Sequence, residues 1–130
     1  ATLASPLRDG NEVANPACVK VVTDADGQAL YFSRAPIPWH RDAWADGAPP
    51  ARLGGGWWRH IGLYAYRAGF LKAYAALPPG ALEQLECLEQ LRILEHGYRM
   101  AVGQLDEHPA PGVDTAADLE RVRHWLAQHG

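Results

Sequence analysis

The spacing of apolar residues divides the first third of the chain into two strands joined by a turn. Valines crowd residues 17–23, and a second apolar run covers residues 29–34. The residues between them contain Asp26 and Gly27, a pair that readily supplies the positive φ of a tight turn. The pattern therefore predicts a β-hairpin over 17–34.

Residues 35–58 have no periodic pattern and are rich in residues that interrupt regular structure. Four prolines and the run of glycines at 54–56 fall in this segment. Proline blocks helix interiors and glycine clusters favour turns, so we expect a long loop. Loops of this length in a compact domain are commonly functional or mobile.

The remaining residues alternate between strand and helix patterns. A strand over 60–66 would place Ile61, Leu63 and Ala65 on one face, with the alternate residues on the other. Helices are expected over 67–77, 81–95 and 115–127, with a strand over 99–105. The helix over 81–95 carries the strongest signal, because it is rich in Leu, Glu and Gln and has no internal Pro or Gly. This order predicts an α/β fold within a single domain.

Composition narrows the class of protein. Apolar residues make up 48% and charged residues 21% of the 130 residues, which is typical of a soluble globular domain. A formal net charge of −3 without a Lys or Arg run speaks against a nucleic-acid-binding protein. No apolar run approaches the ~20 residues of a membrane span. Cys18 and Cys87 lack metal-ligand spacing, and we interpret them as two buried thiols in a reducing cytoplasm.

His60 and Tyr64 form the first candidate site, on the polar face of the strand over 60–66. Residues four apart on a strand lie ~13 Å apart, and Gly62 between them leaves a gap. A small polar ligand could occupy that gap. A buried aromatic cluster, in which Gly62 admits a neighbouring helix, is the alternative interpretation.

Glu89 and Gln90 form the second candidate, on the helix over 81–95. Leu85 and Ile93 stand four residues before and after Glu89, and an unpaired carboxylate among apolar groups is costly to bury. We expect Glu89 to face a ligand, a partner or, in the simplest interpretation, solvent.

Asp114, Arg34 and Arg41 complete the candidates. Asp114 precedes a predicted helix, where a carboxylate can cap the helix or reach a metal ion. A Mg²⁺ site would require a second carboxylate or substrate phosphates as well. Arg34 and Arg41 flank a proline-stiffened segment and suit an anionic substrate, or are ordinary surface residues.

Several motifs jointly resemble one family, the CMP-KDO synthetases, which join CMP from CTP to 3-deoxy-manno-octulosonate (KDO). YFSRAPIPW at 31–39 and HIGLYAYR at 60–67 are similar to two of its motifs. LEQLECLEQLR at 82–92, GVDTAADLE at 112–120 and NPACVKVV at 15–22 are similar to three more. The resemblance covers nearly the whole chain in the right order. It departs from the family in the loop at 43–58 and at His40, where the family often has an acidic residue.

The resemblance implies a nucleotide-diphospho-sugar transferase-like (Rossmann-like) fold, with a mostly parallel sheet between helices and a β-hairpin. Residues 1–130 would be the C-terminal half of a single domain. The reaction would be CTP plus KDO giving CMP-KDO and diphosphate, with Mg²⁺, in the cytoplasm, for lipopolysaccharide biosynthesis.

The resemblance also assigns roles to the candidate residues. Asp114 would be a catalytic Mg²⁺ ligand. Arg34, a second catalytic residue, would face the substrate carboxylate or phosphate together with Arg41. The remaining side chains would hold the sugar acid: His60, Tyr64, Glu89 and Gln90. A homodimer would form through the hairpin region at 17–34.

The family's N-terminal half carries the phosphate-binding loop and the cytidine pocket, and these 130 residues contain neither. We therefore expect the chain to be inactive on its own. Two alternatives stay open: a non-catalytic α/β binding or dimerisation module, and a related sugar-acid nucleotidyltransferase.

Overall fold

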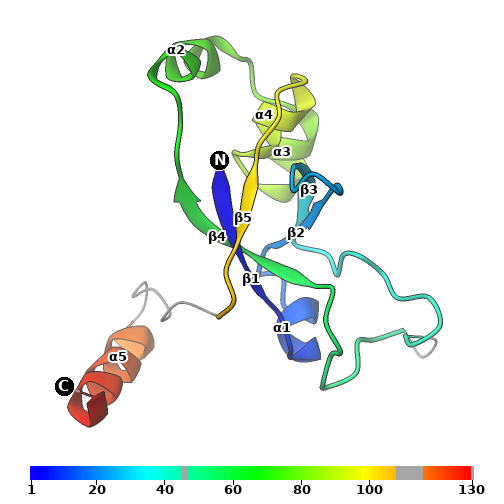
Figure 1. Ribbon diagram of the computed structural model, residues 1–130, viewed down its shortest axis with the longest axis vertical. Helices are drawn as coiled ribbons and strands as arrows, with labels where there is room; N and C mark the ends of the chain where they lie inside the picture. Colours follow the sequence, from blue (N-terminus) through cyan, green and yellow to red (C-terminus); the bar gives the residue numbers. More distant parts are fainter. Residues whose placement is uncertain (45–46, 108–115, 130) are drawn as a thin grey trace.

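A computed structural model describes residues 1–44, 47–107 and 116–129 (Figure 1). The strands are β1 (Thr2–Pro6), β2 (Lys20–Thr23), β3 (Ala29–Ser33), β4 (Trp58–Tyr64) and β5 (Val102–Gln104). The helices are α1 (Gly10–Ala14), α2 (Ala68–Ala76), α3 (Ala81–Glu86), α4 (Leu91–Glu95) and α5 (Ala116–His129). Within the described residues, no helix combines the length and the apolar character needed to cross a membrane.

The five strands form one sheet in the order β3-β2-β4-β1-β5. β2 pairs with β3 and β4 in antiparallel fashion, β4 pairs with β1 likewise, and β1 pairs with β5 in parallel. The α/β class is confirmed, but the expectation of a mostly parallel sheet was wrong for the described strands. Parallel neighbours need a long crossover connection, and among these pairs the β1–β5 pair has one that contains α2, α3 and α4.

The hairpin is confirmed, and its register follows from its turn. Lys20 pairs with Ser33 and Val21 with Phe32. The Asp24 carboxylate accepts hydrogen bonds from the backbone N–H groups of Asp26, at 2.9 Å, and Gln28, at 2.8 Å. Gly27 has φ 73°, the positive φ expected of the Asp-Gly pair. A local signal was therefore sufficient for this element.

β1 and α1 were not predicted. The sequence of β1, TLASP, has neither alternation nor β-branched residues beyond Thr2, and its strand structure comes from pairing on both sides. α1 did carry a signal: the Asp9 side chain caps it by accepting from the Asn11 N–H at 2.8 Å. Asp9 and Glu12 have the spacing of a capping box.

The long helix expected over 81–95 is two short helices. Cys87 ends α3 with φ 52°, in the left-handed region, and α4 begins at Leu91. In a continuous helix the carbonyls of Glu86 and Cys87 would accept from the N–H groups of residues 90 and 91. Both carbonyls accept from the Arg34 side chain instead, at 2.7 and 3.4 Å. A residue distant in sequence therefore replaces the helical hydrogen bonds.

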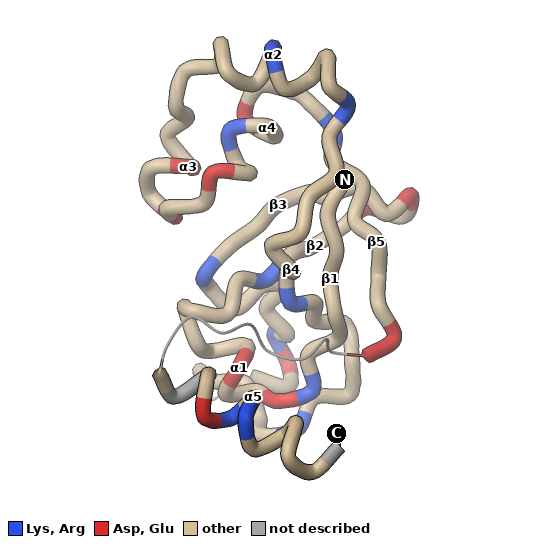
Figure 2. Tube along the Cα trace, turned by 90° about the vertical axis from the view of Figure 1, so that its left-hand side faces the viewer, with Lys and Arg blue, Asp and Glu red and all other residues tan. Residues whose placement is uncertain are grey.

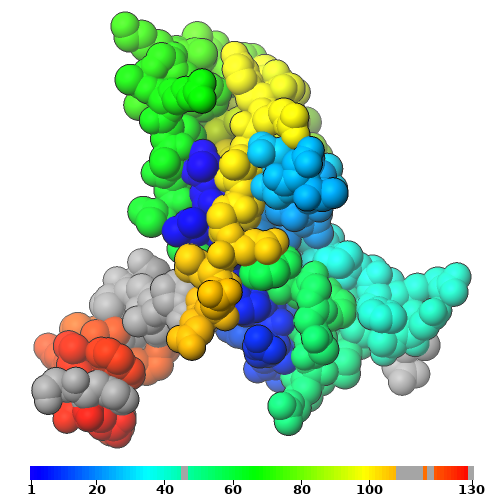
Figure 3. All heavy atoms as spheres, in the orientation of Figure 1, coloured from blue at the N-terminus to red at the C-terminus, as the bar shows by residue number. Residues whose placement is uncertain are grey.

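Two apolar clusters hold the fold together. The larger lies between the sheet and the paired helices α3 and α4, and includes Phe32, Leu88 and Leu91. The smaller lies beneath the long loop and includes Trp44 and Trp57. Figure 3 shows the described residues of the predicted loop, 35–44 and 47–57, projecting to one side of the molecule, and they contain no helix or strand. Lys and Arg are spread over both ends of the molecule among acidic residues, without a basic stripe along the described chain (Figure 2).

Candidate functional site

A pocket of about 510 Å³ opens between the end of β4, α2 and the α3–α4 connection. Its lining combines aromatic rings with two polar side chains from the connection. The lining residues are Tyr64, Tyr66, Leu71, Tyr74, Cys87, Leu88, Glu89 and Gln90. A polar edge beside an aromatic wall is typical of a site for a small hydroxyl-rich ligand.

Tyr64, Glu89 and Gln90, three of the predicted site residues, share this pocket. Glu89 is exposed and Gln90 is buried, and both lie in the connection that follows the end of α3 at Cys87. Glu89 therefore lies on a turn between two helices and not on a helix face as expected. The connection, and not helical periodicity, determines where the two polar groups meet the pocket.

His60 lies behind Tyr64 and is not among the residues that line the pocket. The ring centroids of His60 and Tyr64 are 5.5 Å apart, so the expected gap between them is absent. The pairing of β4 with β1 shifts register between Thr2 and Leu3, which bends β4 at this point. A Cβ on Gly62 would meet no described atom within 4 Å, so Gly62 does not admit a helix either.

A hydrogen bond with Thr2 determines which ring nitrogen of His60 carries the proton. The Thr2 hydroxyl has one proton, which it donates to the Ile61 carbonyl at 3.0 Å or the Leu63 carbonyl at 2.9 Å. The His60 Nε2–H therefore donates to the Thr2 oxygen, at 2.9 Å, and Nδ1 stays an acceptor. Burial lowers the pKa of His60 to about 4, so the imidazole is neutral at physiological pH.

The aromatic wall of the pocket was missed in the sequence. Tyr64 stacks on Tyr66 with centroids 5.7 Å apart, and Tyr66 stacks on Phe70 at 5.7 Å. Burial also raises the pKa of the Tyr64 phenol, so it keeps its proton and can donate. Tyr74 closes the wall: its hydroxyl is 3.5 Å from the Glu89 carbonyl oxygen, and the Arg92 guanidinium lies 5.1 Å from its ring centroid. The signal was the run of aromatics at 64, 66, 70 and 74.

Arg34 follows β3, and the hydrogen bonds of its side chain go to backbone oxygens. Nε donates to the Glu86 carbonyl at 2.7 Å, and the two terminal nitrogens donate to the Pro16 carbonyl at 2.9 Å and the Cys87 carbonyl at 3.4 Å. Arg34 therefore contacts Cys87, which lines the pocket, but does not line the pocket itself. Its contact with a substrate stays a prediction.

Arg41 lies on the long loop beside a separate pocket lined by Trp39, His40 and Trp57. Its side chain is 90% exposed and pairs with Asp42 at 2.8 Å. The structure does not bring Arg41 to Glu89, so its role too stays a prediction. Asp114 lies outside the described residues.

Cys18 is buried, as expected, but Cys87 is exposed and lines the pocket. The expectation of two buried thiols was therefore wrong for Cys87, because the left-handed turn that ends α3 points this residue outward. Within the described part of the chain, no group of three or more His, Cys, Asp or Glu side chains is placed to hold a metal ion.

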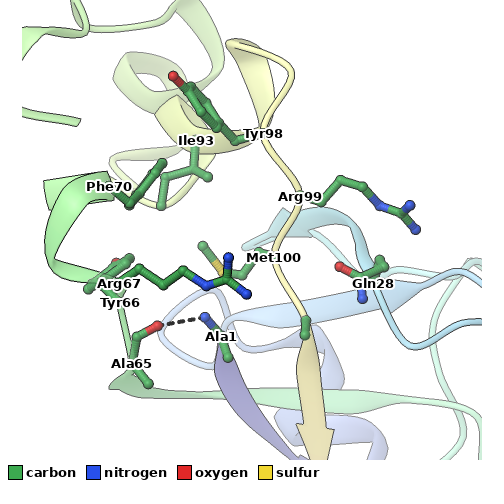
Figure 4. Close-up of a pocket in the computed structure, with 11 residues that line it drawn as sticks. Ala1, Gln28, Ala65, Tyr66, Arg67, Phe70, Ile93, Tyr98, Arg99 and Met100 are labelled. Carbon is green, nitrogen blue, oxygen red and sulfur yellow. Dashed lines mark hydrogen bonds between the residues drawn. The ribbon is translucent and has the colours of Figure 1, made fainter. Parts of the chain in front are cut away.

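A second pocket, of about 520 Å³, is lined by Tyr66 and Phe70 among other residues (Figure 4). Arg67 and Arg99 reach it from two segments, and the Ala1 ammonium donates to the Ala65 carbonyl at 2.7 Å. None of the predicted site residues lines it. The pocket beside Glu89 is therefore the better candidate.

Comparisons with known proteins agree with the motifs. A family model described as cytidylyltransferase matches residues 1–102. The chain is 55% identical over 127 residues to the 3-deoxy-manno-octulosonate cytidylyltransferase of Xanthomonas campestris pv. campestris (strain 8004), which covers 98% of this chain and 51% of that protein. The enzyme of the same name from Aeromonas hydrophila subsp. hydrophila is 56% identical over 127 residues, with 98% and 49% covered.

A solved structure of a CMP:2-keto-3-deoxy-manno-octonic acid synthetase complexed with CTP superposes with a TM-score of 0.84 and 41% identity. The match covers 99% of this chain and 49% of that one, so the chain spans about half the length of the relatives it matches. The nucleotidyltransferase fold is confirmed. On these matches, the chain belongs to the cytidylyltransferase family.

Proposed function

We propose that this chain supplies the sugar-acid half of a CMP-KDO synthetase, which transfers CMP from CTP to KDO. The observation that carries the proposal is the convergence of Tyr64, Glu89 and Gln90 on one pocket. The identity of 55% to proteins named for this reaction supports it. In the reaction, the anomeric hydroxyl of KDO bonds to the α-phosphorus of CTP, and the bond to the diphosphate breaks.

The pocket's groups suit a polyhydroxylated acid. Glu89 accepts hydrogen bonds from sugar hydroxyls, Gln90 both donates and accepts, and the protonated Tyr64 phenol donates. His60 does not line the pocket and has Nε2 committed to Thr2, so the proposed contact with the sugar acid could use only Nδ1, as an acceptor. A neutral imidazole does not attract the sugar carboxylate by charge. An arginine would supply that attraction, and we propose Arg41.

Mg²⁺ and Asp114 are part of the same proposal. Bound to the phosphates of CTP, the metal would offset the charge that develops during transfer. Asp114 lies outside the described residues, and no described cluster offers the remaining ligands. The residues of the described part therefore do not by themselves fit a metal site, and we assign no step to the metal. A cytoplasmic location is proposed because CTP is the nucleotide substrate.

A chimera tests the function. The chain replaces the matching 127-residue segment of the Xanthomonas campestris relative, and diphosphate release is measured with CTP and KDO. We expect turnover that requires both substrates, and a rise in KM for KDO in Gln90→Ala. Gln84→Ala is the matched control, because Gln84 is an exposed glutamine of α3 outside the pocket. A folded chimera without turnover would contradict the proposal.

The chain on its own should release no diphosphate. The relatives are about twice as long, and we infer that the nucleotide is held by the half that this chain does not match. The same coupled assay on the purified 130 residues checks this. Turnover at the rate of the chimera would show that these residues suffice.

We also propose a homodimer through the hairpin region at 17–34. Leu30 on β3 is 60% exposed, an apolar side chain that a partner would cover. Sedimentation equilibrium should show a dimer that Leu30→Asp dissociates. Leu85→Asp is the control, because Leu85 is 81% exposed but lies on α3. A monomeric unmutated chain would contradict this contact.

A further inference from the structure

The α3–α4 connection has the shape of a helix that has been opened by a side chain from another element. Cys87 adopts φ 52°, and such a conformation is unfavourable for a residue with a Cβ. The sequence from 81 to 95 has no Pro or Gly to cause a break. The Leu88 N–H bonds back to the Glu83 carbonyl at 3.2 Å, the closing bond of a helix C-terminus. Something other than local sequence must therefore keep α3 and α4 apart.

Arg34 provides that restraint. Its guanidinium donates to the carbonyls of Glu86 and Cys87, two of the four acceptors that a helix continuing through residues 88–91 would need. A third bond, to the Pro16 carbonyl at 2.9 Å, ties the same group to the segment before β2. Arginine is suited to this because its donors are spread over a planar fork, whereas lysine offers a single point.

Glu86 holds the backbone of Arg34 from the other side. The Glu86 carboxylate accepts from the Arg34 N–H at 2.9 Å, from the Ser33 hydroxyl at 2.5 Å and from the Tyr31 hydroxyl at 3.3 Å. Arg34 therefore donates to Glu86 twice: its side chain donates to the Glu86 backbone carbonyl, and its backbone N–H donates to the Glu86 side chain. Such a reciprocal pair fixes both the distance and the orientation of the two elements.

Lys20 completes the arrangement from within the core. It is fully buried, and its ammonium donates to the carbonyls of Arg34 at 2.5 Å, Cys18 at 2.6 Å and Asn15 at 3.0 Å. We call Lys20, Arg34 and Glu86 the clasp. The clasp joins the end of β3, the start of β2 and the end of α3.

We propose that Arg34 is a positioning residue for the sugar-acid pocket: the clasp keeps the α3–α4 connection open so that Glu89 and Gln90 face Tyr64. This inference rests on the function proposed above. It assigns Arg34 an indirect role, in place of the direct contact with the substrate that the family resemblance implies. Without the clasp, residues 87–90 join a continuous helix, and Glu89 and Gln90 change direction.

Steady-state kinetics of the chimera test the inference. In Arg34→Met we expect KM for KDO to rise at least about 10-fold, with KM for CTP unchanged within about 2-fold, because one displaced ligand group typically weakens binding by this much. Arg34→Lys should be intermediate, and it serves for the comparison if Arg34→Met does not fold. Arg99→Met is the control, since Arg99 is an exposed arginine that pairs with Asp24 at 3.5 Å, away from the pocket.

A second-site change separates positioning from direct contact. Glycine adopts positive φ without penalty, so Cys87→Gly favours the break by itself. If Arg34 acts through the break, Arg34→Met should have a much smaller effect on KM for KDO in a Cys87→Gly background than in the unmutated chimera. An equal effect in both backgrounds, or wild-type KM in Arg34→Met, would overturn the inference.

Hydrogen exchange gives a readout that does not depend on turnover. In the 130-residue chain, Arg34→Met should change amide exchange at residues 87–91, whereas Arg99→Met should not. If the unmutated chimera fails to turn over but this change is seen, the proposed function fails and the clasp stands. Unchanged exchange at 87–91 would overturn the clasp whatever the chimera does.

Discussion

Two regions of the molecule, the one around the pocket and the one around the long loop, are held by different kinds of interaction. On the pocket side, the clasp joins α3 to β2 and β3 through hydrogen bonds that are short, directional and assisted by charge. On the side of the long loop, stacked rings hold the structure, because Trp44 packs on Trp57 with centroids 5.1 Å apart and against Trp39 at 5.0 Å. Aromatic packing stabilises by buried area, whereas the clasp also specifies orientation.

This contrast predicts that the loop side contributes more to stability and the pocket side more to ligand affinity. Arg34 and Glu86 hold the connection that bears the ligand groups, so small displacements there change binding. The Trp44 and Trp57 rings of the long loop are part of the second apolar cluster, where displacing a ring mainly exposes apolar surface. Three substitutions and one pH titration test this division.

Trp44→Ala should have the largest effect on the free energy of unfolding. Trp44 is 1% exposed, and truncating a buried Trp typically costs about 3–5 kcal/mol. Its Nε1 has no hydrogen-bond partner among the described residues, so Trp44→Phe should cost less than half of that. Urea denaturation of the chain measures both. KM for KDO of the folded chimera should stay within about 2-fold, and a selective loss of affinity would break the division.

The pH dependence of stability should report on His60. Its pKa falls from 6.5 to about 4 on folding, so the unfolded chain binds a proton in this window that the folded chain does not. The free energy of unfolding should therefore decrease as the pH falls from about 6.5 to about 4, by at most about 3 kcal/mol. Glu83 and Glu86 have lowered pKa values, so their stabilising contributions are lost only below about 4.5.

Urea denaturation between pH 4 and pH 8 checks this slope. His60→Phe keeps a ring against Phe32 and Tyr64 but removes the titration, so its slope above pH 4.5 should flatten. The same slope in His60→Phe would mean that another group is responsible.

Lys20→Met should lower the free energy of unfolding less than Trp44→Ala does, but it should raise KM for KDO more. Three carbonyls lose their donor. The bonds to Asn15 and Arg34 are partly buried, so water can replace the lysine there, and the buried Cys18 carbonyl left unpaired typically costs about 1–3 kcal/mol. Because Lys20 anchors the Arg34 backbone, KM for KDO should rise as well. Lys72→Met, an exposed lysine of α2, should change neither. A stability loss without any change in KM would show that the clasp serves the fold alone.

Features that neighbouring residues specify could be predicted from the sequence, and features that depend on distant residues could not. The hairpin was predictable because its turn is specified by neighbouring residues, Asp24 to Gly27, and the loop because of its prolines. The broken helix was not, because Arg34, more than fifty residues before Cys87, takes the carbonyls. β1 could not be recognised either, since its strand structure depends on partners at 58–64 and 102–104.

The sequence named three of the residues that line the pocket but not their geometry, and the binding roles assigned to them stay predictions. Tyr64, Glu89 and Gln90 do share a pocket, although the helix expected to carry Glu89 is absent. The distance between His60 and Tyr64 was overestimated, because a straight strand was assumed and β4 bends at its irregular pairing with Thr2. Tertiary hydrogen bonds, from Thr2 and Arg34, decided both differences.

Arg41→Ala should have the smallest effect on the free energy of unfolding, so it shows whether the long loop contributes to KDO affinity apart from stability. The side chain is 90% exposed and its partner Asp42 is 75% exposed, and such surface pairs contribute less than about 0.5 kcal/mol. The proposed contact between Arg41 and the sugar carboxylate contradicts the division and predicts that KM for KDO rises about 10-fold, because the carboxylate would lose a charged bidentate donor. Arg52→Ala, an exposed arginine of the same loop, is the matched control. If the two variants behave alike, the long loop serves only as a cover, and the division between the two sides is complete. If only Arg41→Ala weakens KDO binding, the loop that is held by ring stacking also supplies a ligand group, and affinity depends on both regions.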